Sequence, residues 1–107
     1  MKNKTNKLEG FQRKHLRGLA HSAKPVVFIG QKGITETLNR SINDALTAHE
    51  LIKVKFIDFK EKEKKTEIAG IIEKTHRCEM VGMIGHTAIF YRRHPDEEKR
   101  KIVVPSR

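Results

Sequence analysis

An apolar run, Val26–Ile29, stops at Gly30-Gln31-Lys32-Gly33, and Thr35 follows where a helix can begin. Continuous β-branched and aromatic residues predict a strand that is covered on both faces. The two glycines permit a tight turn and a close approach of another backbone, and Thr35 can cap the next helix. With a right-handed crossover, this turn lies at the C-terminal end of the first strand, an edge of the sheet where ligands often bind.

The segment from Leu8 to Ser22 predicts an amphipathic helix before that strand. Its expected buried stripe has apolar residues at three-to-four spacing: Leu8, Phe11, Leu16, Leu19 and Ala20. The expected opposite side is basic and open to solvent, with Arg13, Lys14, Arg17 and His21. Pro25 should then turn the chain into an extended conformation.

The rest of the chain alternates between helical and strand-like patterns. After the turn, a helix is expected to bury Leu38, Ile42, Ala45 and Leu46, and a strand from Leu51 to bury Ile52, Val54 and Phe56. Lys53 and Lys55 would face solvent from that strand. A third helix follows from Lys60, with Ile68, Ile71 and Ile72 on its apolar stripe.

Two strand-like runs, Glu79 to Ile84 and Thr87 to Tyr91, flank Gly85-His86 and predict a tight hairpin. Ile102 to Val104 could add a short edge strand. The predicted order is therefore α-β-α-β-α-β-β, a mixed four-stranded sheet with three helices in the α/β (α+β) class.

The chain has 107 residues and a formal net charge of +10, which fits one compact domain. Residues 1 to 24 hold seven lysines or arginines against one glutamate, and residues 92 to 107 hold six against three acids. Basic residues concentrated in two segments favour a surface that faces a polyanion. Without an apolar segment long enough to cross a membrane or act as a signal peptide, the expected location is cytoplasmic. The single Cys78 is expected to be structural.

Several separated segments, in order, resemble the CRM domain (chloroplast RNA splicing and ribosome maturation), in particular its bacterial single-domain YhbY-like members. The matching segments are Arg13 to His21, Lys24 to Val27, Gly30 to Thr35, His49 to Lys55, and Ile84 to Thr87 with Tyr91-Arg92 beyond. The resemblance spans about Leu8 to Pro105. It implies one domain over residues 8–105, with a basic extension at 1–7 and a basic segment from about 92.

This resemblance implies a fold similar to the C-terminal domain of bacterial translation initiation factor three, with a GxxG loop like that of KH domains. Members of the family bind RNA, and the bacterial single-domain form is associated with precursors of the large ribosomal subunit. The expected partner is therefore ribosomal RNA, bound by a monomer without a membrane or a small-molecule substrate.

The predicted RNA-binding residues begin with the loop Gly30, Gln31, Lys32 and Gly33, where Lys32 would meet a phosphate. Arg13, Lys14, Arg17, His21 and Lys24 would extend this contact along the first helix, and Tyr91 and Arg92 would add a stacking ring and a charge. The five phenylalanines are expected mostly in the core. Contact with six to ten phosphates would lower affinity by roughly 10³- to 10⁵-fold between 50 and 200 mM salt.

The six histidines lie in different predicted elements and lack the spacing of a metal site. We therefore expect no metal, no cofactor and no catalysis. Alternatives to ribosome assembly are a general RNA chaperone or intron-binding factor, and a protein-interaction or DNA-binding accessory whose basicity is incidental. An RNA-processing enzyme would instead turn over labelled RNA.

Overall fold

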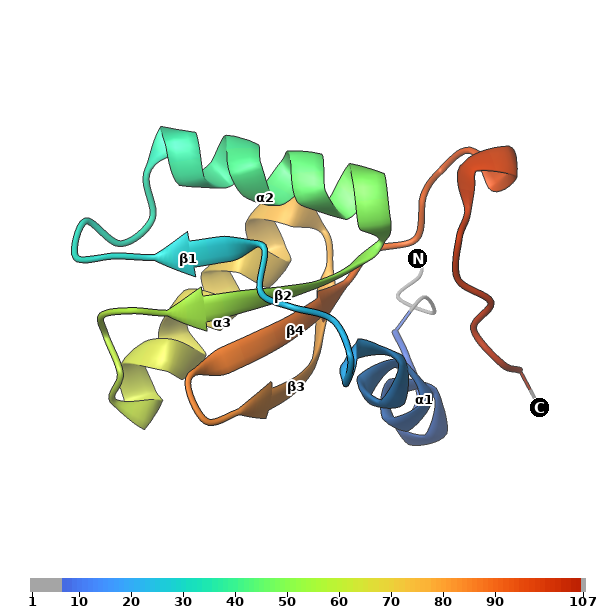
Figure 1. Ribbon diagram of the computed structural model, residues 1–107, viewed down its shortest axis with the longest axis horizontal. Coiled ribbons are helices and arrows are strands. Elements are labelled where there is room, and N and C mark those ends of the chain that lie inside the picture. Colours follow the sequence, from blue (N-terminus) through green and yellow to red (C-terminus); the bar gives the residue numbers. More distant parts are fainter. Residues whose placement is uncertain (1–6, 107) are drawn as a thin grey trace.

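A computed structural model describes residues 7–106. The seven predicted elements form in the predicted order, followed by a short 3₁₀ helix (Figure 1). Their bounds are α1 (Gly10–Ala20), β1 (Val27–Ile29), α2 (Glu36–His49), β2 (Leu51–Phe56), α3 (Lys62–His76), β3 (Glu79–Ile84), β4 (Thr87–Tyr91) and η2 (Glu97–Lys99). Residues 1–6 of the predicted basic extension lie outside the described part of the chain.

The four strands form one mixed sheet in the order β1-β2-β4-β3. β1 and β2 are parallel, because α2 carries the chain back between them, whereas the β2–β4 and β4–β3 pairs are antiparallel. Gly85 and His86 make the predicted two-residue hairpin, and the φ of Gly85 is +60°. The helices α2 and α3 cover one face of the sheet and α1 packs on the other, which gives three layers (Figure 1).

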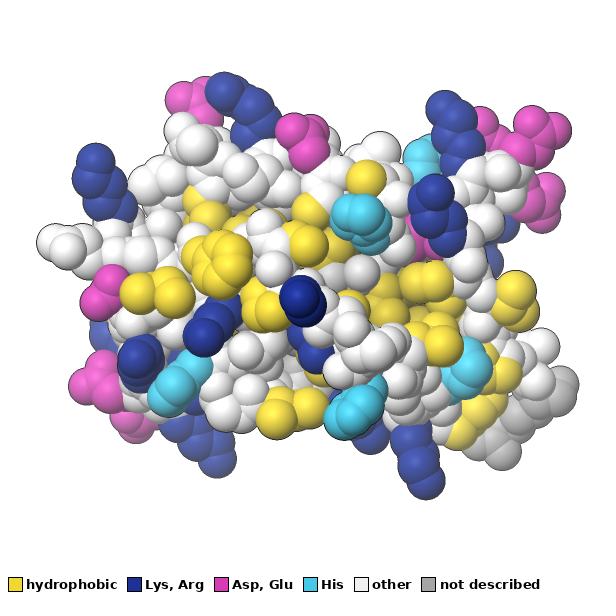
Figure 2. All heavy atoms as spheres, viewed as in Figure 1, with side chains coloured by type: hydrophobic (Ala, Val, Ile, Leu, Met, Phe, Trp, Pro, Cys, Tyr) yellow, Lys and Arg dark blue, Asp and Glu magenta, His cyan; other side chains and the backbone are white. Residues whose placement is uncertain are grey.

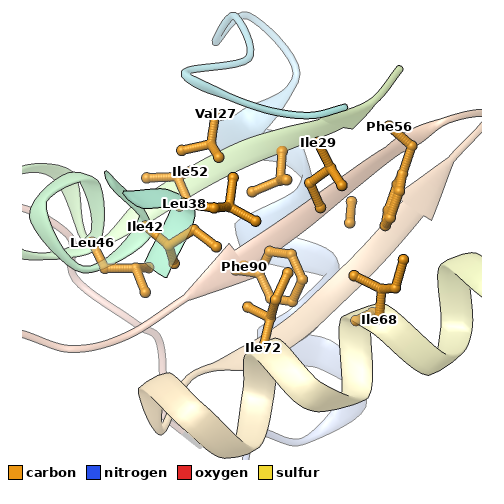
Figure 3. Packing of buried hydrophobic residues seen from close by; sticks show 13 residues of the cluster. Val27, Ile29, Leu38, Ile42, Leu46, Ile52, Phe56, Ile68, Ile72 and Phe90 are labelled. Carbon is orange, nitrogen blue, oxygen red and sulfur yellow. The ribbon is translucent and has the colours of Figure 1, made fainter. Parts of the chain in front are cut away.

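The larger core lies between the sheet and the pair α2 and α3 (Figure 3). As predicted, β2 contributes its alternate residues Ile52, Val54 and Phe56, which are all buried. Ile29, Ile42, Leu46, Ile72 and Phe90 are buried with them, from β1, α2, α3 and β4. The period-two alternation of one strand and the helical spacing of two helices therefore meet in a single apolar cluster.

A smaller core lies under α1, where Leu16 and Ala20 pack against Val81, Ile89 and Tyr91. Leu8 and the C-terminal residues Ile102 and Val104 lie beside this cluster. Since α1 packs on β2, β3 and β4, it covers this face of the sheet at one end. Within residues 7–106, no other helix covers the remainder of this face.

Three predictions about burial are wrong. β1 is not covered on both faces, since Phe28 is 53% exposed and Val26 is exposed beside it. β1 is an edge strand, and its outward side lies beyond the reach of α1. Leu19 of α1 is 46% exposed, because the side that α1 turns to the sheet is Arg13, Leu16, Arg17 and Ala20 instead. Ile71 of α3 is likewise exposed.

The predicted edge strand at 102–104 is also wrong, and the reason is a buried carboxylate. Glu50 sits between α2 and β2 with φ +65°, is almost fully buried, and accepts hydrogen bonds from the backbone N–H groups of His94, Lys101 and Ile102 at 2.7–3.0 Å. These backbone donors, which a strand ladder would use, are thus bound to a side chain. The segment after β4, residues 92–106, is therefore held in an irregular conformation, and we call it the strap.

Within residues 7–106, no helix is long and apolar enough to span a bilayer.

Candidate nucleic-acid interface

The GxxG loop projects from one end of the sheet between β1 and α2 (Figure 1). Gln31 and Lys32 are exposed, and the N–H of Gly33 donates to the carbonyl oxygen of Gly30 at 2.9 Å, which closes the turn. Gly33 has φ +67°, a conformation that favours glycine. The Phe59 ring lies beside Gly33, so that a Cβ there would meet ring carbon Cε2 at 3.6 Å. The loop is therefore a supported, outward-facing bend with little side-chain bulk at either end.

Residues of the chain itself bind part of the free backbone N–H groups at the start of α2. Thr35 caps the helix as predicted, with its Oγ1 accepting from the N–H of Leu38 at 3.1 Å. Glu36 lies in the first turn, as expected, and makes a loose exposed ion pair with Arg40 at 3.9 Å. Glu36 repels a phosphate from this helix end, and the Thr35 cap already binds one of its N–H groups. Lys32 and the loop backbone are therefore the better phosphate ligands.

The predicted basic face of α1 divides into two sets of residues. Arg13 forms an ion pair with Glu79 of β3 and donates to the carbonyl of Leu8, and Arg17 donates to the carbonyl of Val81 at 2.8 Å. The aliphatic stem of Arg17 lies over Gly82, where a Cβ would be only 2.6 Å from its Cδ. These two arginines hold α1 on the sheet. Lys14, His21 and Lys24 are exposed.

Tyr91 and Arg92 also serve the fold. The prediction that Tyr91 offers its ring to a base is wrong, because the residue is 6% exposed and packs in the cluster under α1. Loss of hydration and the nearby charge of Glu50 raise the pKa of its hydroxyl. Arg92 donates to the carbonyls of His76 and Asn43 and to the Thr47 hydroxyl at 3.0–3.2 Å. It therefore ties the ends of α2 and α3 together.

The strand register defines rows of side chains across the face that α1 leaves open. Phe28, Lys55, Thr87 and Ile84 form one row, since Phe28 pairs with Lys55, Lys55 with Thr87, and Thr87 with Ile84. Phe28, Lys55 and Ile84 are exposed and Thr87 is half-buried. This row is the one nearest the GxxG loop. We call it the open row.

A second row runs parallel to the open row, towards α1. Val26 lies next to Lys53, its N–H donating to the Lys53 carbonyl at 3.0 Å, and Lys53 pairs with Ile89. Val26 is exposed, whereas Ile89 is buried under α1. The Lys53 ammonium donates to the carbonyl of Ala23 at 3.0 Å and so holds the segment that leads into β1. The cover over the sheet thus decreases from α1 towards the loop.

A groove of about 820 Å³ continues this surface between α1, the start of β2 and the C-terminal strap. Five basic residues line it, and none of its described lining residues is acidic: His15, Lys24, His49, Lys53 and Lys101. Apolar residues, including Leu19, Val26 and Val103, make up the rest of its walls. In Figure 2 hydrophobic side chains gather over β1 and β2 on this face, with lysine and histidine side chains among them. The groove joins positive charge to an apolar surface.

Three lysines make the surroundings of His86, in the hairpin turn between β3 and β4, positive. Loss of hydration and the charges of Lys65, Lys60 and Lys55 lower the pKa of His86 in the hairpin turn. The Lys65 ammonium donates to the carbonyl of Gly85 at 2.7 Å and lies 3.2 Å from Nδ1 of His86. The lowered pKa and the facing ammonium both favour the neutral ring of His86, with Nδ1 as the acceptor. The lysines, rather than this histidine, supply charge here.

The structure changes one spatial expectation. The sequence places Arg13, Lys14 and Arg17 on a helix that adjoins the GxxG loop, but α1 and the loop lie at opposite ends of the sheet (Figure 1). The open row and the groove occupy the surface between them. Phe28 and Lys101 were missed by the sequence prediction, whereas the alternation around Lys53 and Lys55 had indicated a wet, basic side of β2.

Two further reactive side chains, Cys78 and His76, take part in packing and hydrogen bonding. Burial, chiefly, raises the pKa of the Cys78 thiol to about 12, so the residue behaves as a packed hydrophobe, as expected. His76 is buried with its Nε2 3.0 Å from Oδ1 of Asn39. Among residues 7–106, no three histidines, cysteines or acids are grouped as metal ligands would be.

The fold and this surface define a small α+β domain with an exposed glycine loop beside a basic sheet face. The chain belongs to the CRS1/YhbY (CRM) domain family, whose model matches residues 8–92. It is 42% identical over 94 residues to a protein of Haemophilus influenzae named RNA-binding protein, covering 88% of this chain and 91% of that one. It is 34% identical to the Probable RNA-binding protein YqeI of Bacillus subtilis, over 92% of this chain and 99% of that one.

A solution structure from Staphylococcus aureus, of a protein described as a candidate RNA-binding protein, has the same fold. The TM-score is 0.76 at 33% sequence identity, and the match covers 91% of this chain and all of the other. The resemblance seen in the sequence is thus confirmed at the level of family and fold.

Proposed function

We propose that this protein binds ribosomal RNA in precursors of the large ribosomal subunit and acts there, in the cytoplasm, without catalysis. The observation that carries the proposal is the continuous surface from the exposed GxxG loop, over the open row, to the basic groove. Relatives over most of its length are named RNA-binding proteins. A lysine-rich surface of this kind suits a phosphate backbone, whose contacts supply affinity and register.

In this mechanism the RNA backbone crosses the sheet from end to end. Lys32 and the loop backbone meet phosphate at one end, and Lys24 and Lys101 meet phosphate in the groove at the other. Lys53, whose ammonium is bound to the Ala23 carbonyl, adds positive charge beside them. Arg13, Arg17 and Arg92 act indirectly, because their hydrogen bonds position α1 and the helix ends. Few groups on this surface can read base edges, so the proposed binding has low sequence specificity and relies on RNA shape.

Sedimentation of a cell lysate tests the assembly role. The proposal predicts the protein in fractions that hold precursors of the large subunit, and its release from them by high salt. A protein found solely in the free pool would contradict the role. Crosslinking in cells followed by sequencing then separates it from a general RNA chaperone: one confined site in large-subunit RNA is expected, whereas scattered transcripts would favour the chaperone. Incubation of labelled RNA with pure protein should give no turnover.

A further inference from the structure

Phe28 is the one aromatic residue among the large hydrophobic side chains that the described structure exposes. Its ring stands on the outward side of β1, in the open row, where the neighbouring strand presents Lys55. Val26 and Ile84 extend the apolar surface to either side of these two residues. A flat ring on an uncovered sheet face, next to an ammonium group, has the two components that single-stranded nucleic acid binding combines.

The charges around the Phe28 ring favour RNA over an apolar protein surface as the ligand that binds there. Lys55 pairs directly with Phe28 across the strands. Together with Lys60 and Lys65, it lowers the pKa of His86 at the same end of the sheet. Asp58 follows β2 at this same end, with its N–H donating to the Ile29 carbonyl at 3.2 Å, but neither Asp58 nor Glu61 belongs to the open row. An apolar protein partner would have to bury these ammonium groups, whereas a nucleotide brings a phosphate to them and a base to the ring.

We propose that Phe28 is a stacking platform for an unpaired RNA base, with Lys55 beside it on the adjoining phosphate. This inference rests on the proposed RNA binding and deepens it, because it names single-stranded RNA as the substrate class. Phe28 precedes Gly30 by two residues, about 7 Å along an extended strand. A strand whose phosphate lies at the GxxG loop therefore brings a neighbouring base over the ring.

The proposal also predicts which RNA is refused. Bases inside a duplex are stacked on one another, and their faces are closed to a side chain. A hairpin stem should then bind through phosphate contacts alone, without any contribution from Phe28. An unpaired strand of equal length should gain from the ring.

Titration of labelled single-stranded oligoadenosine, twelve nucleotides long, tests this directly. Phe28→Leu should weaken binding by about 5- to 100-fold, the range of base–aromatic stacking, and leave the salt slope unchanged. Phe28→Tyr should restore the affinity. Lys55→Ala should instead lower the salt slope by about 0.7, the value of one phosphate contact on a single strand. Against a twelve-base-pair RNA duplex, Phe28→Leu should match the unaltered protein.

Because the sequence contains no tryptophan, Phe28→Trp introduces a single reporter. Its indole fluorescence should be quenched by oligoadenosine, whereas Ile71→Trp, at an exposed position on α3 across the sheet, should not respond. Unchanged affinity in Phe28→Leu, or an unquenched indole in Phe28→Trp, would overturn the platform while the unaltered protein still binds RNA. Absence of RNA binding by the unaltered protein would instead refute the proposed function itself.

Discussion

The alternation of side chains along each strand serves packing on one face of the sheet and exposure on the other. Phe56 and Phe28 lie one position apart in register on neighbouring strands, since Phe56 pairs with Ile29. Phe56 points into the core between the sheet and α2 and α3, and is fully buried, whereas Phe28 points out and is half exposed. One face is closed by two helices and the other by a single helix at one end. Packing stabilises the first face, and the second remains available to a ligand.

The largest expected effect separates these two phenylalanines by stability. Phe56→Ala should lower the free energy of unfolding by about 3–5 kcal/mol, because it leaves a cavity in the core. Phe28→Ala should change it by less than about 1 kcal/mol, since about half of the residue is exposed to water already. Urea unfolding followed by circular dichroism measures both. Equal losses would mean that the open face is as closely packed as the core.

The next effect concerns RNA affinity at the loop. Replacing both Gln31 and Lys32 with Asp should cost about 3 kcal/mol of binding free energy, because two carboxylates then face the phosphates that Lys32 attracts. Both side chains are exposed, so the urea midpoint should barely change. Fluorescence anisotropy at fixed salt gives the affinity. The matched control is Thr37→Asp with Arg40→Asp on the outer side of α2, also exposed, which should weaken binding far less.

A third effect tests the strap that borders the groove. Glu50→Gln should reduce stability by about 1.5–3 kcal/mol, because a charged acceptor of three backbone N–H groups becomes a neutral amide. Limited proteolysis should show faster cleavage within residues 93–106. If the strap stays protected and the stability is unaltered, then the carboxylate is not what holds this segment.

The smallest effect is a dependence of stability on pH. Burial and the charge of Arg92 lower the pKa of His76 below its ordinary 6.5, so the folded state binds fewer protons than the unfolded state. Stability should therefore be complete above pH 6.5 and fall as the pH drops through the lowered value, with a slope of at most about 1.4 kcal/mol per pH unit. Thermal melting at several pH values should show this slope in the unaltered protein and a shallower one in His76→Gln. Equal slopes would remove His76 as the cause.

Local sequence patterns were sufficient to predict the helices and strands and the residues of the larger core. The alternation of Ile52, Val54 and Phe56 and the spacing of Leu38, Ile42 and Leu46 each specify one face without knowledge of the rest. The GxxG loop was also readable, because glycine and a capping threonine act within a few residues. These features depend on neighbours in sequence.

The features that the sequence did not predict depend on contacts between distant segments of the chain. Whether the outward side of β1 is covered depends on its place at the sheet edge and on the reach of α1, so the exposure of Phe28 was missed. Arg13 and Arg17 looked like charges without partners in the fold, yet Glu79 and the backbone of β3 accept hydrogen bonds from them, while Arg17 stays exposed as expected. Tyr91 looked accessible at a strand end, but α1 packs over it. In each case tertiary packing overrode a local expectation.

The central claim is that RNA lies along the open sheet face from the GxxG loop to the groove. An amide NMR titration of the full chain with single-stranded RNA tests it residue by residue. The account predicts the largest shift changes at residues 26–33, 53–55 and 87, and small ones along the exposed side of α3 at residues 63–74. Changes concentrated on α3, with the loop and β1 unaffected, would contradict it.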